Sequence, residues 1–188
     1  PGLGVGIPGM YPSYAPAYNA SKSWGTPWSS VGIFVPWEMY KQYGDTSLIR
    51  EYFGSMSAYM DAMETLTLEG CDYLASDGGF CGDWLALDKP PFEYTDASVY
   101  VYTLGCMAEM SEAIGEWERA RRYRELHAKG KAEWNVRHVD PATGRMTALA
   151  GESQSSYAIA LFYELIEERH EEAAVRYLAK KVEAGWDG

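Results

Sequence analysis

The chain has 188 residues, of which 47% are hydrophobic and 23% are charged. These proportions are typical of a folded globular domain and exclude a wholly disordered chain. Its 27 acidic and 16 basic residues give a formal net charge of −11 at pH 7. That charge would repel a nucleic-acid backbone or an anionic membrane surface, and no apolar run reaches the roughly 18–20 residues that span a bilayer. We therefore expect no nucleic-acid partner and no membrane partner.

The spacing of metal-ligating residue types predicts no metal and no cofactor. Cysteines and histidines do not show a zinc-binding pattern. A stretch rich in aspartate and glycine raises the alternative of calcium, but its carboxylates do not follow the EF-hand spacing. Phosphate-binding glycine loops and a G-x-S-x-G nucleophile are also absent from the sequence. The residues weighed were Cys71, Cys81, Cys106, His127, His138, His170, Asp77, Asp83 and Asp88.

The first 30 residues are rich in Gly, Pro, Ser and Tyr, and we interpret them as a long loop. From residue 31 the apolar positions recur at intervals of three and four, which predicts helices. Gly44 and Gly115 should end two of them, Asp45 or Thr46 should cap one, and Asp96 or Ser98 another. The expected helices cover 31–43, 47–63, 98–114, 117–134, 153–166 and 171–184, and residues 67–95 form a second irregular stretch.

The pattern predicts an all-α fold of about six helices in three antiparallel hairpins. The links within the pairs are short and those between the pairs are long. Such hairpins can form a bundle, a short solenoid or part of a toroid. We expect a single piece of one domain, with residues 1–30 as loop and 31–188 as helical hairpins.

Aromatic residues are abundant, with seven Trp, 15 Tyr and five Phe. Most should belong to the core, but an amphipathic ring in a wet cleft can stack on a sugar and donate a hydrogen bond to it. Both irregular stretches carry tryptophan, in SWGTPWSSVG and SDGGFCGDWLALDKP. Asp77 there is most simply a turn residue. Asp83 beside Trp84 either binds sugar hydroxyls or holds a neighbouring loop, and the residues favour neither role.

Three segments, in order over about residues 8–186, resemble the bacterial α-L-rhamnosidases of glycoside hydrolase family 78. The first is WSSVGIFVPWEMYKQYGDTSLIREYF, in which the matching positions are Trp28, Val35, Pro36, Trp37, Tyr43, Gly44 and Asp45. The second is GFCGDWLAL at 79–87, similar to the family's Gly-Asp-Trp-Leu segment. The third is ESQSSYAIALFYELI at 152–166. The chain departs from the family at Ser30, where many members carry a sugar-contacting aspartate.

The resemblance implies half of an (α/α)6 toroid from an enzyme that removes terminal α-L-rhamnose from glycosides with inversion. It implies sugar contacts at Trp28, Ser30, Trp37, Asp83 and Trp84, and a rhamnose-containing glycoside as partner. The family's general acid lies in an Asp-Cys-Pro-x-Arg-Glu type motif upstream and its base lies downstream. Neither motif occurs in the sequence, so the resemblance implies that both lie outside the chain, which alone should be inactive.

Two alternatives stay open at this point. One is a six-hairpin glycosidase for a different sugar, and the other is a helical-hairpin interaction module, although no fixed repeat period supports the latter. Half a toroid would leave helix faces uncovered, so we expect self-association through exposed helix faces. The resemblance implies a bacterial parent protein and leaves the cytoplasm and the periplasm as alternatives.

Overall fold

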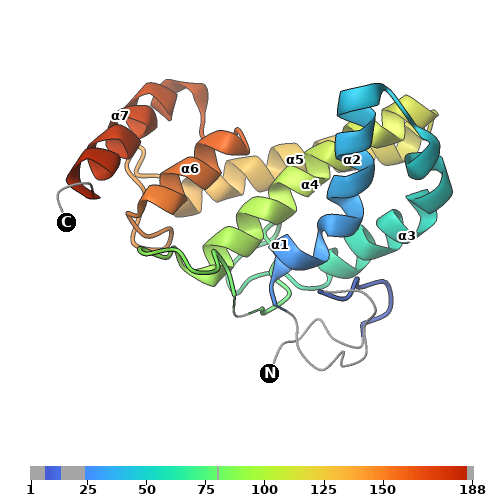
Figure 1. The fold of residues 1–188 in the computed structure, drawn as a ribbon, viewed down its shortest axis with the longest axis horizontal. Helices are drawn as coiled ribbons and strands as arrows, with labels where there is room; N and C mark the ends of the chain where they lie inside the picture. Colours follow the sequence, from blue (N-terminus) through green and yellow to red (C-terminus); the bar gives the residue numbers. More distant parts are fainter. Residues whose placement is uncertain (1–6, 14–23, 80, 186–188) are drawn as a thin grey trace.

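The computed structural model describes residues 7–13, 24–79 and 81–185 (Figure 1). Within these residues every named element is a helix, so the prediction of an all-α fold is confirmed, and the only extended pairings are two isolated bridges. The helices are α1 (Thr26–Ser29), α2 (Val31–Tyr43), α3 (Ser47–Glu64), α4 (Phe92–Ile114), α5 (Trp117–His138), α6 (Gln154–Phe162) and α7 (Glu168–Gly185).

Six of the helices form three consecutive hairpins, α2/α3, α4/α5 and α6/α7. Residues 44–46, 115–116 and 163–167 close them. Gly44 (φ 67°) and Gly115 (φ 87°) end α2 and α4 in the left-handed conformation that glycine adopts without steric cost. The hairpins and both of these helix ends are therefore as the sequence predicted.

Several helix boundaries differ from expectation, and among them α5 runs on to His138 and α7 begins at Glu168. The extra helix α1 lies in the stretch assigned to loop, where Pro27 supplies a backbone angle already suited to a first helical turn. Helix α4 begins at Phe92 after Pro91, so Asp96 and Ser98 lie inside it as buried residues and do not cap it. Helix α6 ends at Phe162, because Glu164 is left-handed (φ 54°) and the chain turns Leu165 into the core.

Helix α4 is the centre of the structure. It contacts α1, α2, α3, α5 and α6, and most of its residues are buried (Figure 1). Two apolar clusters meet along it. One cluster contains Ile33 and Met60 from the first hairpin, and the other contains Trp134 and Tyr157 from the second and third hairpins. Both clusters contain residues of α4, so this helix takes part in the packing of all three hairpins.

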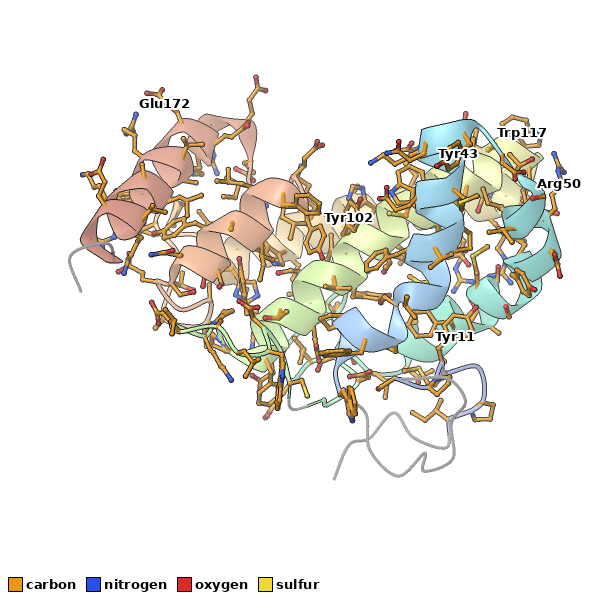
Figure 2. The ribbon with its side chains drawn as sticks, in the orientation of Figure 1. Tyr11, Tyr43, Arg50, Tyr102, Trp117 and Glu172 are labelled. Carbon is orange, nitrogen blue, oxygen red and sulfur yellow. The ribbon has the colours of Figure 1, made fainter. Side chains whose placement is uncertain are left out.

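Several apolar side chains stay exposed on the described helices, including Val31, Val35 and Phe162 on α2 and α6. Tyr102 lies between these two helices (Figure 2), where its ring stacks on Tyr163 with 4.5 Å between centroids. Self-association through such faces stays a prediction. No helix among the described residues is both long and apolar enough to cross a membrane.

His138 makes the stability of the second cluster sensitive to acid. Its ring is 1% exposed and packs edge-on against Tyr94 and Trp134. Burial, and then the charge of Arg137, lowers the pKa of His138 to about 3. The unfolded chain therefore takes up this proton first, near pH 6.5. The contribution of the neutral ring to stability is present above about pH 6.5 and is lost as the pH falls towards 3.

We expect His138→Phe to remove the pH-dependent contribution of this side chain to stability, because phenylalanine keeps an aromatic ring but cannot bind a proton. Below pH 6 the free energy of unfolding of the wild type should fall by up to about 1.4 kcal/mol per pH unit more steeply than that of the variant. Denaturant unfolding at pH 4.5, 5.5 and 7 measures the two slopes. Parallel slopes would show that His138 does not carry the acid sensitivity.

Candidate functional site

The long connections gather at one end of the hairpins. Residues 65–91 and 139–153 are the long connections that lead into α4 and α6, and residues 24–25 lead into α1 and α2 at the same end (Figure 1). The short connections lie at the opposite end. Binding residues concentrate on loops held by a rigid scaffold. The loop end is therefore the candidate site, and it carries Trp28, Asp83 and Trp84.

Two of these loops are bound directly to each other. The amide of Cys81 donates to the carbonyl of Trp24 at 3.0 Å. At Gly79 the backbones approach so closely that a Cβ would lie 1.9 Å from the amide nitrogen of Gly25. Only glycine permits such an approach. The tryptophan stretch before α1 and the Gly-Asp-Trp-Leu stretch thus form one unit, although they are more than 50 residues apart in the sequence.

Asp96 of α4 lies next to Gly25 in this contact, and its side chain is fully buried. Its Oδ1 accepts the amide of Thr26 at 3.0 Å, and its Oδ2 accepts the hydroxyl of Ser76 at 2.5 Å. Burial, and then the charge of Asp77, raises the pKa of Asp96 to about 8. The carboxyl of Asp96 thus contacts both loops from α4 and has an unusual affinity for a proton.

A second part of the network surrounds Tyr59 of α3. The Tyr59 hydroxyl lies 2.9 Å from the Oγ of Ser29 and 3.0 Å from the Oγ of Ser30. Ser29 Oγ also donates to Asp77 Oδ2 at 3.2 Å. All four residues are buried, and burial raises the pKa of Tyr59. These contacts fix the start of α2 to α3 and to the second loop.

An open cavity of about 350 Å³ lies between the second loop and the start of α6. Asp83 and Trp84 line it, and Trp84 is 53% exposed. Lys89 places its ammonium 5.6 Å from the centroid of the Trp84 ring. Leu85 is left-handed (φ 67°), a strained conformation for leucine of the kind that clusters at functional sites. The remaining lining residues are Leu85, Ala86, Leu87, Asp88, Gln154 and Ser155.

The structure brings two of the five predicted sugar contacts, Asp83 and Trp84, into this cavity. Trp28 is partly exposed and meets Trp24 edge-on. Ser30 is fully buried, and Trp37 is 6% exposed with its Nε1 donating to the Tyr102 hydroxyl at 3.2 Å. Direct sugar contact stays a prediction for all five. At Ser30 and Trp37 it would require these covered side chains to become accessible.

Sequence reasoning did not single out three features of this end. Gln154 and Ser155 reach the cavity from the start of α6, and their signal was the third matching segment, which contains both. Asp96 was interpreted as a helix cap, and Asp77 as a turn. Asp77 does accept the amide of Gly79 at 3.1 Å, as in a turn, but it is also fully buried beside Asp96.

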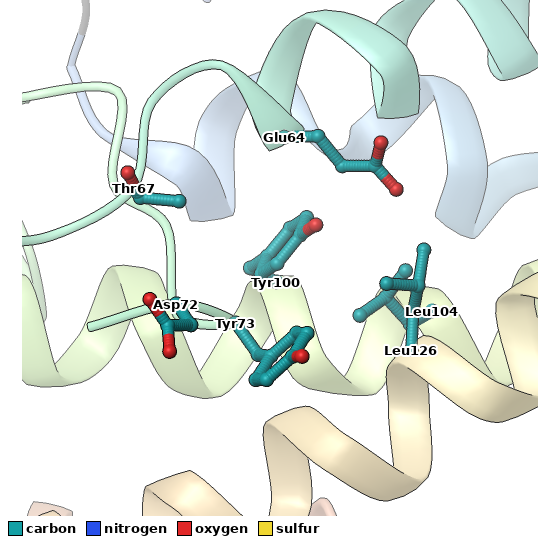
Figure 3. A pocket seen from close by; sticks show the side chains of 7 residues that line it. All are labelled: Glu64, Thr67, Asp72, Tyr73, Tyr100, Leu104 and Leu126. Atoms are coloured by element: carbon teal, nitrogen blue, oxygen red, sulfur yellow. The ribbon is translucent and has the colours of Figure 1, made fainter.

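Another pocket, of about 180 Å³, lies against α3, α4 and α5 (Figure 3). It shares no lining residue with the Asp83 cavity. Of its two carboxylates, Glu64 and Asp72, Glu64 already pairs with Arg122 at 2.5 Å. Across residues 7–13, 24–79 and 81–185 no group of three or more His, Cys, Asp or Glu side chains is placed to hold a metal ion. The Asp83 cavity is therefore the candidate binding site.

Three consecutive helical hairpins, with a tryptophan-bearing cavity at the end where the long connections lie, define an all-α hairpin domain. A family model described as the bacterial alpha-L-rhamnosidase 6 hairpin glycosidase domain matches residues 7–186. Because this match covers nearly the whole chain, the chain belongs to that family.

Individual relatives agree with this assignment. An α-L-rhamnosidase from Streptomyces avermitilis is 24% identical over 177 residues, which are 94% of this chain and 16% of the relative. The crystal structure of a Streptomyces avermitilis α-L-rhamnosidase complexed with L-rhamnose superposes with a TM-score of 0.85 at 24% identity, covering 96% of this chain and 17% of that one. A rhamnosidase from Klebsiella oxytoca with rhamnose bound gives a TM-score of 0.71 at 19% identity, covering 92% and 34%. The chain thus spans a small part of these relatives.

Proposed function

We propose that this chain is a segment of the catalytic domain of an inverting α-L-rhamnosidase and supplies part of its sugar pocket. The observation that supports this most strongly is the open cavity carrying Asp83 and Trp84 at the loop end of a domain of this family. An exposed indole can stack on the C–H face of a sugar. A carboxylate beside it can form charge-assisted hydrogen bonds with hydroxyl groups.

The general acid and base are proposed to lie outside residues 1–188. Inverting glycosidases need two carboxyl groups roughly 6.5–9.5 Å apart, across the bond that is cleaved. The motifs that carry them in the family are missing from this sequence. The part of the reaction assigned to this chain is therefore to bind and orient the sugar at Trp28, Asp83 and Trp84. Two solved relatives were obtained with rhamnose, which makes rhamnose the proposed sugar.

The test is Trp84→Ala in the proposed full-length enzyme, assayed on an aryl α-L-rhamnoside. Loss of the stacking surface should lower kcat/KM by about ten-fold or more, equivalent to about 1.4 kcal/mol of transition-state binding. Trp117→Ala is the matched control, because Trp117 is 65% exposed at the short-turn end (Figure 2). Equal effects of the two variants would contradict the assignment of the cavity.

A panel of other aryl glycosides separates the remaining alternatives. If the enzyme cleaves a glycoside of a different sugar and not the rhamnoside, the protein is still a six-hairpin glycosidase, but the proposed substrate is wrong. If no glycoside is cleaved or bound and the chain captures a helical peptide, the protein is an interaction module and the proposed function is wrong.

A further inference from the structure

We propose that Asp96 is a positioning residue, which in its protonated form locks the loop carrying Trp28 against the loop carrying Asp83 and Trp84. The inference rests on the proposed function in one respect, because these loops form the proposed sugar pocket. The lock itself is a property of the fold and can be measured without any sugar.

The first argument is the placement of Asp96. It lies in α4, the central helix, and one carboxyl group reaches two other segments. Its Oδ1 accepts the first amide of α1, that of Thr26, at 3.0 Å, and its Oδ2 contacts the hydroxyl of Ser76 at 2.5 Å. Helix α1 carries Trp28, and the loop of Ser76 continues to Trp84. The Asp77 carboxyl also contacts both segments, accepting the hydroxyl of Ser29 at 3.2 Å and the amide of Gly79 at 3.1 Å, but it belongs to the second loop, whereas Asp96 reaches both segments from the central helix.

The second argument is that the loops are packed for a single relative position. Thr26 Oγ1 accepts the amide of Asp77 at 3.4 Å, and Cys81 donates to the carbonyl of Trp24 at 3.0 Å. A Cβ at Gly25 would lie 3.1 Å from Oδ1 of Asp96. Both loops therefore pack around the carboxyl group of Asp96. A change in the charge or position of this group should shift the two loops relative to each other.

The third argument is the charge around Asp96. Asp77 from the second loop, Glu93 from α4 and Tyr59 from α3 face this region, and all three are acidic groups. Asp77 and Asp96 are both fully buried. Two ionised carboxylates in such a place repel each other. A proton on Oδ2 of Asp96, donated to the Oγ of Ser76 2.5 Å away, removes this repulsion and stabilises the closed arrangement, although the hydrogen bonds from Ser76 and Thr26 by themselves favour the ionised form. Burial and the charge of Asp77 accordingly raise the pKa of Asp96 to about 8.

The direction of the pH effect follows from linkage. Asp96 binds its proton more tightly when the loops are locked than when they are open, where its pKa is near the ordinary 3.8. The stabilisation is therefore complete below about pH 4, is lost as the pH rises towards 8, and changes little above that. Over this window the equilibrium constant for opening can rise by at most about ten-fold per pH unit.

Hydrogen exchange at pH 5.5 and 7.5 tests the lock on the chain without ligand. The reporters are peptides containing the amides of Thr26 and Cys81, and their protection is expressed relative to the intrinsic exchange rate at each pH. In the wild type we expect protection to be about 10- to 100-fold higher at pH 5.5. In Asp96→Asn the side-chain carboxamide at position 96 does not titrate, so the protection of the reporter peptides should be equal at the two pH values.

Ser111→Ala is the matched control, because Ser111 is an equally buried residue of α4 whose hydroxyl bonds only within the helix, to the carbonyl of Met107. It should keep the wild-type pH dependence. If Asp96→Asn fails to fold, Ser76→Ala removes one of the two contacts of Asp96 and should lower protection at Cys81 at least five-fold at pH 5.5. Equal wild-type protection at both pH values, or an unchanged pH dependence in Asp96→Asn, overturns the proposal.

The affinity for L-rhamnose separates failure of the lock from failure of the proposed function. With both correct, the dissociation constant of the wild type rises between pH 5.5 and 7.5, and that of Asp96→Asn stays constant. If no variant binds rhamnose at either pH, the proposed function is wrong, and the exchange result still decides the role of Asp96. If rhamnose binds but protection does not depend on pH, only the lock is wrong.

Discussion

The 188-residue chain is expected to cleave an aryl α-L-rhamnoside at least about 10⁴-fold more slowly than the α-L-rhamnosidase of Streptomyces avermitilis under the same conditions. The reason is that the proposed general acid and general base both lie outside the chain, and each such group typically contributes 10²–10⁴-fold. The measurement is release of the aryl group, with the relative as positive control and a circular dichroism spectrum to show that the chain is helical.

Asp83→Asn makes this experiment decisive. If the chain alone cleaves the rhamnoside and Asp83→Asn abolishes the cleavage, then at least one catalytic carboxylate is inside the chain. The proposal that the chain supplies only sugar binding, with both catalytic carboxylates outside it, would then be wrong. If neither protein cleaves it, the result agrees with a chain that contributes sugar binding and no acid or base catalysis.

Replacing Trp134 by alanine is expected to destabilise the chain by about 3–5 kcal/mol, a large part of the stability of a domain this size. Trp134 is fully buried in the cluster that joins the second and third hairpins, and it packs on Tyr94. Its Nε1 donates to the hydroxyl of Ser98 at 2.9 Å. The variant therefore leaves a cavity and also removes a buried hydrogen bond.

Trp117→Ala serves here as a second tryptophan deletion in the same helix, α5. The Trp117 ring is 65% exposed, so the free energy of unfolding should change by no more than about 0.5 kcal/mol. Urea unfolding followed by circular dichroism gives both values. Similar losses for the two variants would mean that the second cluster does not hold the hairpins together as described.

The helical hairpins could be predicted from the sequence because their signals are local. The apolar spacing of α3 and the glycines that end α2 and α4 depend on a few neighbouring residues, and the structure confirms them. The helix predicted to start at Ser153 starts one residue later, with Ser153 as its cap, accepting the amide of Ser156. Errors occurred where a proline opened a helix, as at Pro27 and Pro91, because the same residue is also typical of loops.

The candidate site was only partly predictable, since its contacts are long-range. Asp96 and Thr26 are 70 residues apart, and Ser29 and Asp77 are 48 apart. A carboxylate inside a helix is usually on a solvated face. Nothing in the neighbours of Asp96 shows that the structure buries it beside another carboxylate. Asp83 and Trp84 were found because they lie next to each other in a glycine-rich segment.

The unequal lengths of the connections bear on how this domain can diversify. Closing a longer loop costs little, roughly 0.6 kcal/mol for each doubling of its length. Insertions in residues 139–153 or 81–91 would therefore reshape the proposed sugar pocket at little cost to the helices. The tight turns at 44–46 and 115–116 have no such freedom. In directed evolution, the residues to vary are therefore those of the long connections. Gly25, Gly79 and Asp96 should be kept unchanged.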